Sequence, residues 1–481
     1  MAIFTEKQYR EELTKLCKGE NFATADAAYF AELDRISGGL KEMIVANTDD
    51  LTTDTGTTYY VSMTGDDKND GKSIDTAIAT IDRLNEIEMN EGDLVVFERG
   101  GVFRGMVEGK SGVSYSAYGK GPKPKIFKAY DGKTDAEWIK TEYENVWCFD
   151  KVYDDKDIGV IVFNDGECYA EKKLTIAELQ NELDFIYCTE WTNQENPDNK
   201  VYLYCSKGNP AEAFHQIDLS RADSIIKMPP RSHDIHIKNL ELRYAQDIFF
   251  VTRGENISMS YCVCGWTGGD LGAGKTHQVR YGGGAGGWLS CETITFDHCY
   301  IYQQFDSGVT PQYHLKDEDA GVFRNFITTD CLFENVEYTL EYFHTQLPVI
   351  GNGYENMYFG YNICLKGGHG FGDKTAQSAY VKSWGHENVC TDCRIEYNVF
   401  DRAAALSLEI IGHDHGKRGD AVSYDHIPKL SHNVYIEPQN KVFANINKIM
   451  YKFNEASHIA LEKLGVENGA VYVYAKELTE K

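Results

Sequence analysis

Six segments in the second half of the chain align with one another without gaps, and this repeat restricts the possible folds more than any other feature. Each segment opens with a polar residue, continues with Asn or Cys, and then alternates apolar positions with others. Another short strand-like run, such as ISMS, TITF or NMYF, precedes most of them. The six segments begin at Lys238, Tyr261, His298, Asp330, Tyr361 and Tyr397.

A repeat of about 20 to 50 residues built from short strands, without helices or a Trp-Asp blade signature, is typical of a β-solenoid. Each strand of such a fold pairs with its equivalent one coil further along, so equivalent side chains stack at about 4.8 Å. We expect small thiol and amide side chains to form an inward ladder at these positions. Its expected members are Cys262, Cys299, Cys331, Asn362, Asn398 and the neighbouring Cys364 and Cys393.

The rest of the chain divides by composition. Residues 1–56 are expected to form an N-terminal segment of two helices and an acidic, Thr-rich linker, and residues 57–136 the first coils. A β-rich insertion with one short helix in LTIAELQNEL is expected over 137–215, the main coils over 216–440, and a C-terminal capping segment over 441–481. The N-terminal segment is a candidate cap for the open end of the solenoid.

The net charge of -26 and the pI near 4.9 argue against nucleic acid or an anionic membrane as a partner, since phosphates would be repelled. A neutral substrate fits this charge better. An anionic polymer such as polygalacturonate would require a local cluster of Arg, Lys or calcium. Whether the chain forms an oligomer stays open.

The first residues, MAIFTEKQYREELTKLCKGE, lack the basic start, apolar stretch and cleavage site of a secretory signal, although a chain whose signal had been removed would look the same. No run of about 18 apolar residues suggests a transmembrane helix. An odd number of cysteines, 13, favours reduced thiols over a disulfide framework. A cytoplasmic location is therefore expected.

Two stretches carry a family resemblance. TYYVSMTGDDKNDGKSIDTAIATIDRLNE, followed by GDLVVFERGGVFRG and GVSYSAYGKGPKPKIF, resembles the opening of bacterial right-handed parallel β-helix proteins of the pectate-lyase-like superfamily. RYGGGAGGWLSCETITFDHCYIYQQFDSGVTPQ resembles the glycoside-hydrolase-type members. The likeness covers about residues 57–440 and implies an all-β, right-handed parallel β-helix. It leaves the reaction open, because hydrolases, lyases, esterases, epimerases and phage tailspikes share this fold.

Three carboxylates interrupt apolar or small stretches of the repeats and are the candidate catalytic residues: Asp306, Glu341 and Glu409. Glycoside hydrolysis requires two carboxyl groups, one protonated to assist the leaving oxygen and one ionised. A charged group within an apolar strand is costly unless it is paired. The alternative interpretation is that Asp306 caps a turn and that the glutamates pair with bases on an outer face.

The gapless alignment also predicts geometry. Glu341 occupies column 12 of its segment, and Asp373 and Glu409 occupy column 13 of the two that follow. Neighbours on such a line approach the roughly 5 Å of a retaining pair, and next-nearest neighbours the roughly 6.5 to 9.5 Å of an inverting pair. The stereochemical outcome stays open because the turns differ in length.

Residue types that sugar sites use surround these carboxylates. Trp266, beside the Gly-rich WTGGDLGAG, is the first candidate for stacking on a sugar ring, with packing between coils as the alternative. The full set of expected substrate-binding residues is Trp266, His277, Arg280, Gln312, His344, His369, Asp373 and Trp384.

Other motifs are weaker. The run GGGAGG at 282–287 is expected to be a loop, since it lacks the context of a phosphate cradle. No metal site is expected: the CxC and CxxC pairs lie in separate coils, and His413 and His415 are expected to line a surface or groove. The acidic GDDKNDG is expected to be a tight turn. No cofactor is expected, with a divalent cation such as calcium remaining open.

These features favour a glycoside hydrolase acting on an oligosaccharide or a plant-type polysaccharide fragment. A polysaccharide lyase or uronate epimerase is the alternative, but it needs basic residues, and the aligned coils contain few beyond Arg243, Lys366 and Arg402. A non-catalytic carbohydrate-binding β-helix is the third reading. Such proteins usually present smooth repeats, whereas this chain has irregular loops that carry Trp, His and carboxylate side chains.

Overall fold

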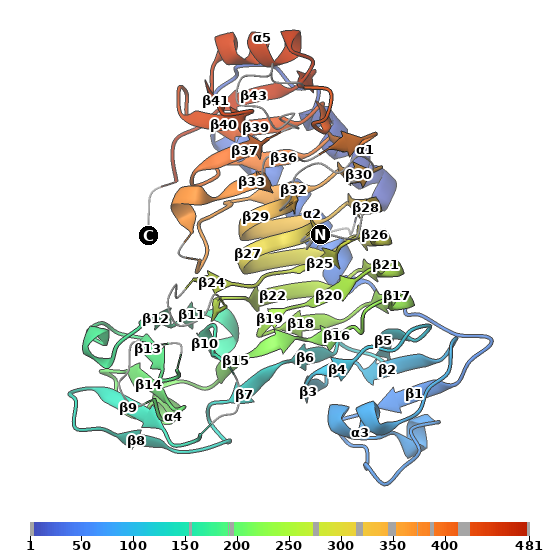
Figure 1. Cartoon of the computed structure of the whole chain (residues 1–481), viewed down its shortest axis with the longest axis vertical. Helices are drawn as coiled ribbons and strands as arrows, with labels where there is room; N and C mark the ends of the chain where they lie inside the picture. Colours follow the sequence, from blue (N-terminus) through green and yellow to red (C-terminus); the bar gives the residue numbers. More distant parts are fainter. Residues whose placement is uncertain are drawn as a thin grey trace.

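The computed structural model in Figure 1 describes residues 4–152, 156–190, 192, 197–272, 279–313, 321–344, 353–372, 374–384, 389–411 and 424–478. For residues 313, 343 and 344 it describes the backbone alone. The protein is mostly β, and most of its strands belong to two large sheets, a 13-stranded and a 16-stranded one.

The 13-stranded sheet follows one main path. Its strands, in spatial order, are β1 (Thr58–Val61), β2 (Leu94–Glu98), β5 (Ser114–Tyr118), β17 (His233–Lys238), β21 (Glu255–Ser260), β26 (Glu292–Asp297), β28 (Val322–Thr329), β31 (Tyr358–Gly360), β35 (Arg394–Glu396), β38 (Lys429–Ser431) and β42 (Glu467–Asn468). Two further strands, β30 (Gly353–Glu355) and β34 (Cys390–Thr391), extend from β28.

The 16-stranded sheet has two arms that share its two longest strands. The first arm comprises β3 (Val102–Arg104), β6 (Lys125–Phe127), β18 (Glu241–Arg243), β22 (Val263–Thr267), β27 (Tyr300–Tyr313), β29 (Leu332–His344), β32 (Ile363–Leu365), β36 (Val399–Asp401), β39 (Val434–Glu437) and β43 (Val471–Tyr474). The second arm comprises β20 (Phe249–Thr252), β25 (Ala285–Trp288), β27, β29, β33 (Ala379–Trp384), β37 (Leu406–Ile410), β40 (Val442–Ile446) and β41 (Ile449–Lys452).

From β17 onward, strands of the 13-stranded sheet alternate along the chain with strands of the 16-stranded sheet. Equivalent strands of successive repeats pair in parallel, as β17 does with β21 and β18 with β22. One cluster of buried apolar side chains takes in both sheets, for example Ile237 of β17 and Leu242 of β18. The two sheets therefore enclose a common core.

The register tests the repeat alignment column by column. Val263, Tyr300, Leu332, Ile363 and Val399 are successive register partners, as the alignment of the last five segments predicts. The first segment is displaced by one residue, because Val263 pairs with Glu241. It should begin at Asn239, whose φ of 62° is positive like the φ of 50° of the turn residue Tyr261.

The expected polar ladder runs through the buried second column. Cys331 N donates to Asn362 Oδ1 at 2.9 Å, Asn362 Nδ2 to Asn398 Oδ1 at 3.0 Å, and Asn398 Nδ2 to Asn433 Oδ1 at 3.0 Å. Asn433 Nδ2 then donates to Glu467 at 3.3 Å. These bonds satisfy amides that would otherwise be costly to bury.

The remaining cysteines occupy other places. Cys364 is the register partner of Phe333 and Phe400, which is a different column, and Cys393 lies between β34 and β35. Every cysteine of the chain is a free thiol, and all except Cys168 are buried.

The N-terminal segment contains two helices, α1 (Glu6–Leu16) and α2 (Ala27–Ala46). Leu13 of α1 and Leu40 of α2 pack in one apolar cluster with Leu332 and Ile363 of the first arm. In Figure 1 the blue helices run beside the sheets rather than across one end. The helices therefore cover a flank of the first arm, and the expected end cap was wrong for them.

The short segment between these helices does cover an edge. Thr24 forms a parallel bridge with Tyr474, Ala25 N donates to Tyr474 O at 2.8 Å, and Tyr474 N donates to Ala23 O at 2.8 Å. The segment thereby extends the sheet beyond β43. An exposed strand edge is a template for association with other chains, and this pairing removes it.

The insertion forms its own antiparallel and mixed sheet of β8 (Trp138–Lys140), β9 (Val146–Phe149), β12 (Glu171–Lys172), β13 (Asp184–Tyr187) and β14 (Val201–Tyr204). The helix expected in LTIAELQNEL is only a 3-10 turn, η3 (Ile176–Glu178). A neighbouring sheet contains β7 (Ala129–Asp131), β10 (Ile161–Phe163), β11 (Cys168–Tyr169), β15 (Ile217–Ser224) and β19 (Ala245–Asp247).

Small elements complete the chain. Two pairs stand apart from the other sheets, β4 (Val107–Glu108) with β16 (Ile226–Lys227), and β23 (Asp270–Leu271) with β24 (Arg280–Tyr281). The short helices are η1 (Ile74–Thr76), α3 (Ile81–Glu86), η2 (Asn164–Gly166), α4 (Pro210–Ala213), η4 (Thr375–Gln377) and α5 (Glu455–Lys463). α3 and α5 lie at opposite ends of the molecule (Figure 1). None of the helices described has the length and apolar character required to cross a membrane.

The run GGGAGG is tightly packed, and its second half is a strand instead of the expected loop, whereas Gly282, Gly283 and Gly284 lie outside any strand. Ala285–Trp288 forms β25, which pairs in parallel with β27. A Cβ atom at Gly284 would lie 1.6 Å from the carbonyl oxygen of Gly308, and one at Gly286 would lie 1.9 Å from that of Thr310. Glycine is therefore required because neighbouring backbone leaves no space for a side chain.

Candidate active site

The second arm presents a column of polar side chains on its outer face. Glu341 of β29 is the register partner of Lys382 of β33, and Lys382 is the partner of Glu409 of β37. Glu409 in turn pairs in register with Asn445 of β40. The residue before Glu341, Leu340, belongs to the apolar core. Since successive side chains of a strand point to opposite faces, the polar column faces away from the core.

Asp306 lies where the register between β27 and β29 shifts. Its side chain is largely buried, and Oδ1 is 3.0 Å from Lys374 Nζ. The same ammonium group lies 4.9 Å from the ring centre of Tyr281 and 5.8 Å from those of Phe305 and Tyr338. An ammonium group held by a carboxylate and three aromatic rings is a well-defined local positive charge.

Glu341 is 5% exposed and is surrounded by hydrogen-bond donors. Gln312 Nε2 donates to Glu341 Oε2 at 3.3 Å. The side chains of Trp384 and Ser307 also hydrogen-bond to the Glu341 carboxyl group. These contacts come from β27 and β33, the two strands that flank β29, so the orientation of Glu341 is set from both sides.

Burial raises the pKa of Glu341 to about 8, and the negative charge of Asp306 adds to the rise. The positive charge of Lys374 and the hydrogen bonds of Trp384 and Ser307 act in the opposite direction. Glu341 is therefore protonated at neutral pH. The two carboxyl groups differ in environment, because Asp306 has an ammonium partner and Glu341 is desolvated.

Glu409 has a different role. It forms a short ion pair with Lys382, and Asn445 Nδ2 donates to its other oxygen at 3.3 Å. Its side chain is partly exposed. The structure thus brings Glu341 and Glu409 into one column but places a lysine between them. This agrees with the alternative interpretation for Glu409, an ion pair on an outer face.

A third carboxylate lies close to Asp306 and was not predicted. Asp247 ends β19, and Gly283 N donates to its Oδ1 at 3.2 Å. Burial raises the pKa of Asp247 to about 7, and the charges of Asp306 and Asp223 contribute to this rise. Its signal in the sequence was weaker than that of Glu341, because Asp247 precedes the apolar IFF but follows Gln246.

Two lysines were also missed, Lys374 and Lys382. Lys382 stands between apolar and small residues in AYVKSW, so the criterion applied to carboxylates would have found it. Lys374 precedes η4, outside any strand, and no pattern marks it. The column predicted for Asp373 is occupied by Lys382, because the segment between β32 and β33 is longer than the gapless alignment allows.

Exposed aromatic side chains border this site. Tyr281 is 41% exposed, Trp288 39% and Trp384 37%. Trp288 is the register partner of Gln312, whose amide group contacts Glu341. Trp384, one of the expected binding residues, contacts Glu341 directly. Exposed aromatic rings can stack on a ligand, and the neighbouring carboxyl groups can hydrogen-bond to it.

Three predicted binding residues, Trp266, Arg280 and His369, either stabilise the fold or lie away from Glu341. Trp266 is buried, packs 5.5 Å from Tyr169 and 5.7 Å from Phe371, and belongs to an apolar cluster, so it cannot stack on a sugar. Its alternative interpretation, packing, is correct.

Arg280 and His369 are the other two. Arg280 donates to the carbonyl oxygens of Gly269 at 2.8 Å and Gly159 at 3.1 Å, so it holds the β23–β24 pair in place. His369 is exposed, and its pKa is lowered by burial of the ring and by the charges of Lys441 and Arg402. The charged groups near His369 thus include Lys441 and Arg402, whereas those near Glu341 include Asp306 and Lys374.

Several expectations lie outside the described residues. These are His277, Asp373, His413 and His415, together with the side chain of His344. Gln312, Trp384, Asp306, Glu341 and Glu409 are the predicted residues that the structure brings together on the second arm.

One group of side chains has metal-ligand spacing within the described part of the chain. The ligand atoms of Asp297, His298 and Asp330 lie within 4.8 Å of one another. Asp330 is already paired through both oxygens with Arg10, whose Nε is 2.8 Å from Oδ1. His298 is bonded to Asp297 at 2.9 Å. The cation at this place is therefore the guanidinium group of α1.

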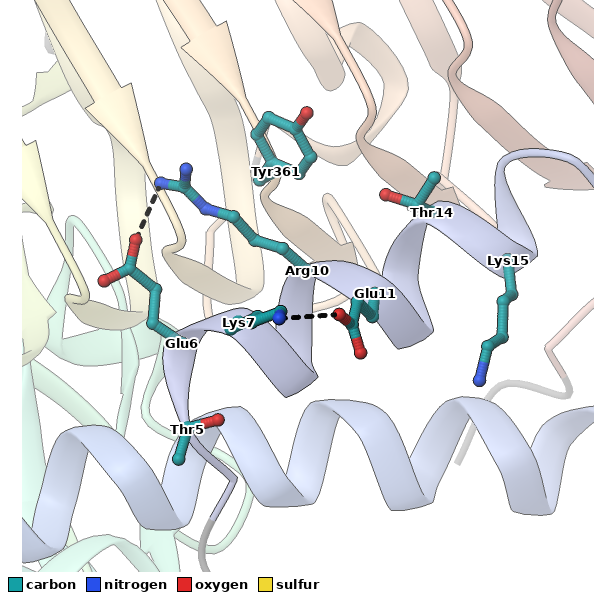
Figure 2. A pocket seen from close by; sticks show the side chains of 8 residues that line it. All are labelled: Thr5, Glu6, Lys7, Arg10, Glu11, Thr14, Lys15 and Tyr361. Carbon is teal, nitrogen blue, oxygen red and sulfur yellow. Dashed lines mark ion pairs between the residues drawn. The ribbon is translucent and has the colours of Figure 1, made fainter.

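Arg10 also lines an open groove of about 800 Å³ beside α1 (Figure 2). Its walls combine ion pairs such as Lys7 with Glu11 and Arg10 with Glu6, and Tyr361 closes one side. The groove lies on the flank covered by α1, so it is separate from the carboxyl groups of the second arm.

Sequence comparisons identify no relative of the chain, whereas several solved structures are similar to it at low identity. No family model matches the chain, and no curated protein matches it. A structure titled glycoside hydrolase is similar over 87% of this chain and 96% of that chain, with 9% identity and a TM-score of 0.47.

Two further structures are similar at the same low level. A GH136 lacto-N-biosidase from Eubacterium ramulus shares 14% identity over 94% of this chain and 71% of its own, with a TM-score of 0.33. An alginate lyase from Paenibacillus sp. shares 10% identity over 82% and 93%, with a TM-score of 0.38. These similarities decide neither reaction nor substrate, so chemistry has to be inferred from the residues of the site.

Proposed function

We propose that the chain is a glycoside hydrolase built on a right-handed parallel β-helix, with Glu341 as general acid and Asp306 as its ionised partner. The proposal for the fold is supported by parallel pairing between equivalent strands of successive repeats. The proposal for the reaction is supported by one observation: two neighbouring carboxyl groups in different environments, Asp306 paired with an ammonium group and Glu341 desolvated with a raised pKa.

Glycosidic cleavage requires two carboxyl groups whose environments favour different protonation states. Glu341, neutral at pH 7, can donate its proton to the leaving glycosidic oxygen. Asp306, stabilised in the charged form by Lys374 at 3.0 Å, can then attack the anomeric carbon or take a proton from the attacking water. Both the retaining and the inverting course remain open. No cofactor takes part in either.

The charges near the site favour a neutral sugar. The ammonium groups of Lys374 and Lys382 are each paired with a carboxylate, Asp306 and Glu409, and Glu341 is uncharged at neutral pH. The five groups together carry no net charge. A uronate would therefore find no unbalanced positive charge among them, whereas hydroxyl groups can bond to Gln312 and the carboxyl groups.

A polysaccharide lyase or uronate epimerase is the second candidate. The sequence showed few basic residues in the aligned coils, but Lys374 and Lys382 lie beside the carboxyl groups and favour this candidate. Such a reaction needs a base at the carbon next to the uronate carboxyl group. Lys382, beside Glu341 and Trp384, has the chemistry of such a base once it is freed from Glu409. A carbohydrate-binding protein without catalysis is the third candidate.

One experiment separates the three. The purified chain is incubated with a panel of nitrophenyl glycosides and neutral oligosaccharides between pH 4 and pH 9, in parallel with an absorbance assay for unsaturated uronates. We expect sugar release from at least one neutral substrate and no absorbance rise. An absorbance rise on a uronate polymer without release from any glycoside overturns the hydrolase. Binding without either reaction identifies the third candidate.

A further inference from the structure

We infer that Trp288 and Trp384 form two sugar-stacking platforms on opposite sides of the bond that is cleaved, and that the preferred substrate is a linear oligosaccharide of at least four units lying across the strands. The inference rests on the proposed function and adds to it the length and direction of the substrate.

The first observation is the exposure of these two residues. Among the tryptophans that the structure describes, Trp288 and Trp384 are the ones that are exposed, at 39% and 37%, whereas Trp138 and Trp266 are buried. A ring that is more than a third exposed leaves part of its surface open to stack on a sugar. Both rings lie on the second arm, which also carries the carboxyl groups.

The second observation is their alignment. Trp288 is the register partner of Gln312, Gln312 of Phe343, and Phe343 of Trp384. The two tryptophans thus occupy one column on strands β25 and β33, with β27 and β29 between them. Three strand spacings of about 4.8 Å separate their backbones by about 14 Å.

The carboxyl groups lie on the two intervening strands. Asp306 belongs to β27 and Glu341 to β29. Across the strands, Trp288 lies on one side of the carboxyl pair and Trp384 on the other, and Glu341, which hydrogen-bonds to Gln312 and Trp384, lies beside the tryptophan column. If each pyranose unit of an extended chain advances by about one strand spacing of about 4.8 Å, two outer rings and two inner rings span the distance between the platforms.

The rings are also held in fixed orientations. Lys382 Nζ lies 4.0 Å from the centre of the Trp384 ring, and Tyr338 meets that ring edge-on at 5.9 Å. Phe250 meets the Trp288 ring edge-on at 6.0 Å. Rings that are oriented before binding lose little conformational entropy when a sugar stacks on them.

The test is a chain-length series on the sugar that the glycoside screen identifies, with kcat/KM measured for chains from two to six units. Wild-type kcat/KM is expected to rise up to about four units and then to level off. Trp288→Ala and Trp384→Ala should each lower kcat/KM for the four-unit chain by about tenfold and for the two-unit chain by much less. Trp288→Phe, which keeps an aromatic ring, should recover most of the loss.

Tyr143→Ala is the control, since Tyr143 is 48% exposed and lies in the insertion between β8 and β9. It should behave as wild type at every chain length. Hydrolysis with the same kcat/KM at all lengths, or tryptophan variants that match the control, would overturn the platforms and leave the proposed function intact.

A complete absence of hydrolysis would instead refute the proposed function. Titration calorimetry with the neutral oligosaccharides of the screening panel then decides the platforms directly. Binding that Trp288→Ala and Trp384→Ala weaken but Tyr143→Ala does not would support them, and an absence of binding, or equal binding by all variants, would overturn them.

Discussion

Glu341 and Glu409 occupy the same column of the 16-stranded sheet, two strands apart, and the residue between them, Lys382, pairs with Glu409. The ion pair neutralises Glu409, whereas Glu341 stays desolvated and keeps its proton to about pH 8. Of the two glutamates, Glu341 alone has the properties of an acid catalyst. The partner of Glu341 in the proposed reaction is therefore Asp306, on the neighbouring strand β27.

This assignment predicts unequal effects of two isosteric changes. Glu341→Gln removes the proton that the leaving oxygen needs, so it should lower kcat by at least about a hundredfold. Glu409→Gln leaves Lys382 with a neutral partner and should lower kcat by less than about tenfold. Both values are measured on the substrate from the glycoside screen. An equal loss of kcat in the two variants would mean that Glu409 takes part in catalysis together with Glu341.

The pH dependence follows from the raised pKa of Glu341. Above about pH 8 the carboxyl group loses its proton, so kcat/KM should fall tenfold for each further pH unit. In Glu341→Gln this alkaline limb should be absent from the residual activity. A wild-type profile that stays flat to pH 10 would exclude Glu341 as the acid.

The same group predicts a change in stability. A carboxyl group whose pKa is higher in the folded than in the unfolded chain contributes stability below its unfolded pKa, and this is lost as pH rises through the folded value. For Glu341 the loss extends to about pH 8. Glu341→Gln should therefore melt at the same temperature as wild type near pH 4 and at a higher temperature at pH 8. A lower melting temperature at both pH values would mark Glu341 as structural.

The sequence could reveal the strand repeats because their hydrophobic alternation and polar second column are local patterns. It failed at Asn239, which resembles the ladder residue Asn362 but has the left-handed backbone of a turn, with φ of 62°. In the first segment Leu240 fills the ladder position, and no composition rule distinguishes the turn residue Asn239 from the ladder residue Asn362. The opening strands of five segments were therefore aligned correctly, and that of the first was displaced.

The site was harder to predict for a physical reason. Its columns are joined by segments of unequal length, so gapless counting assigned Asp373 to a place that Lys382 occupies. Trp266 resembled a platform because its packing partners, Tyr169 and Phe371, come from distant parts of the chain. Contacts of this kind arise from tertiary folding and leave no periodic signal.

Removal of divalent cations supplies a further prediction. The proposed reaction depends on carboxyl groups that already have lysine or amide partners, so activity after dialysis against EDTA should stay within about twofold of the untreated value. The assay uses the substrate from the glycoside screen, with calcium restored in a parallel sample. Activity that is lost in EDTA and restored by calcium would favour the lyase, in which a cation holds the uronate.

The ion pair of Arg10 with Asp330 predicts how strongly α1 is held against the sheet. The Asp330 side chain is fully buried, and Arg10 also lies 4.8 Å from the centre of the Tyr361 ring. Arg10→Ala would leave a buried carboxylate without its cation, which should lower the free energy of unfolding by about 3 kcal/mol. Lys7→Ala, which breaks only the exposed pair with Glu11, should cost less than about 0.5 kcal/mol.

A second change separates the charge from the packing of Arg10. In the double variant Arg10→Ala with Asp330→Asn the buried group is a neutral amide, so it needs no cation. Urea unfolding should then recover a substantial part of the loss caused by Arg10→Ala alone, with a coupling of about 1 kcal/mol or more between the two positions. Strictly additive losses would mean that Arg10 holds α1 through its contact with Tyr361, and that the charge on Asp330 contributes little.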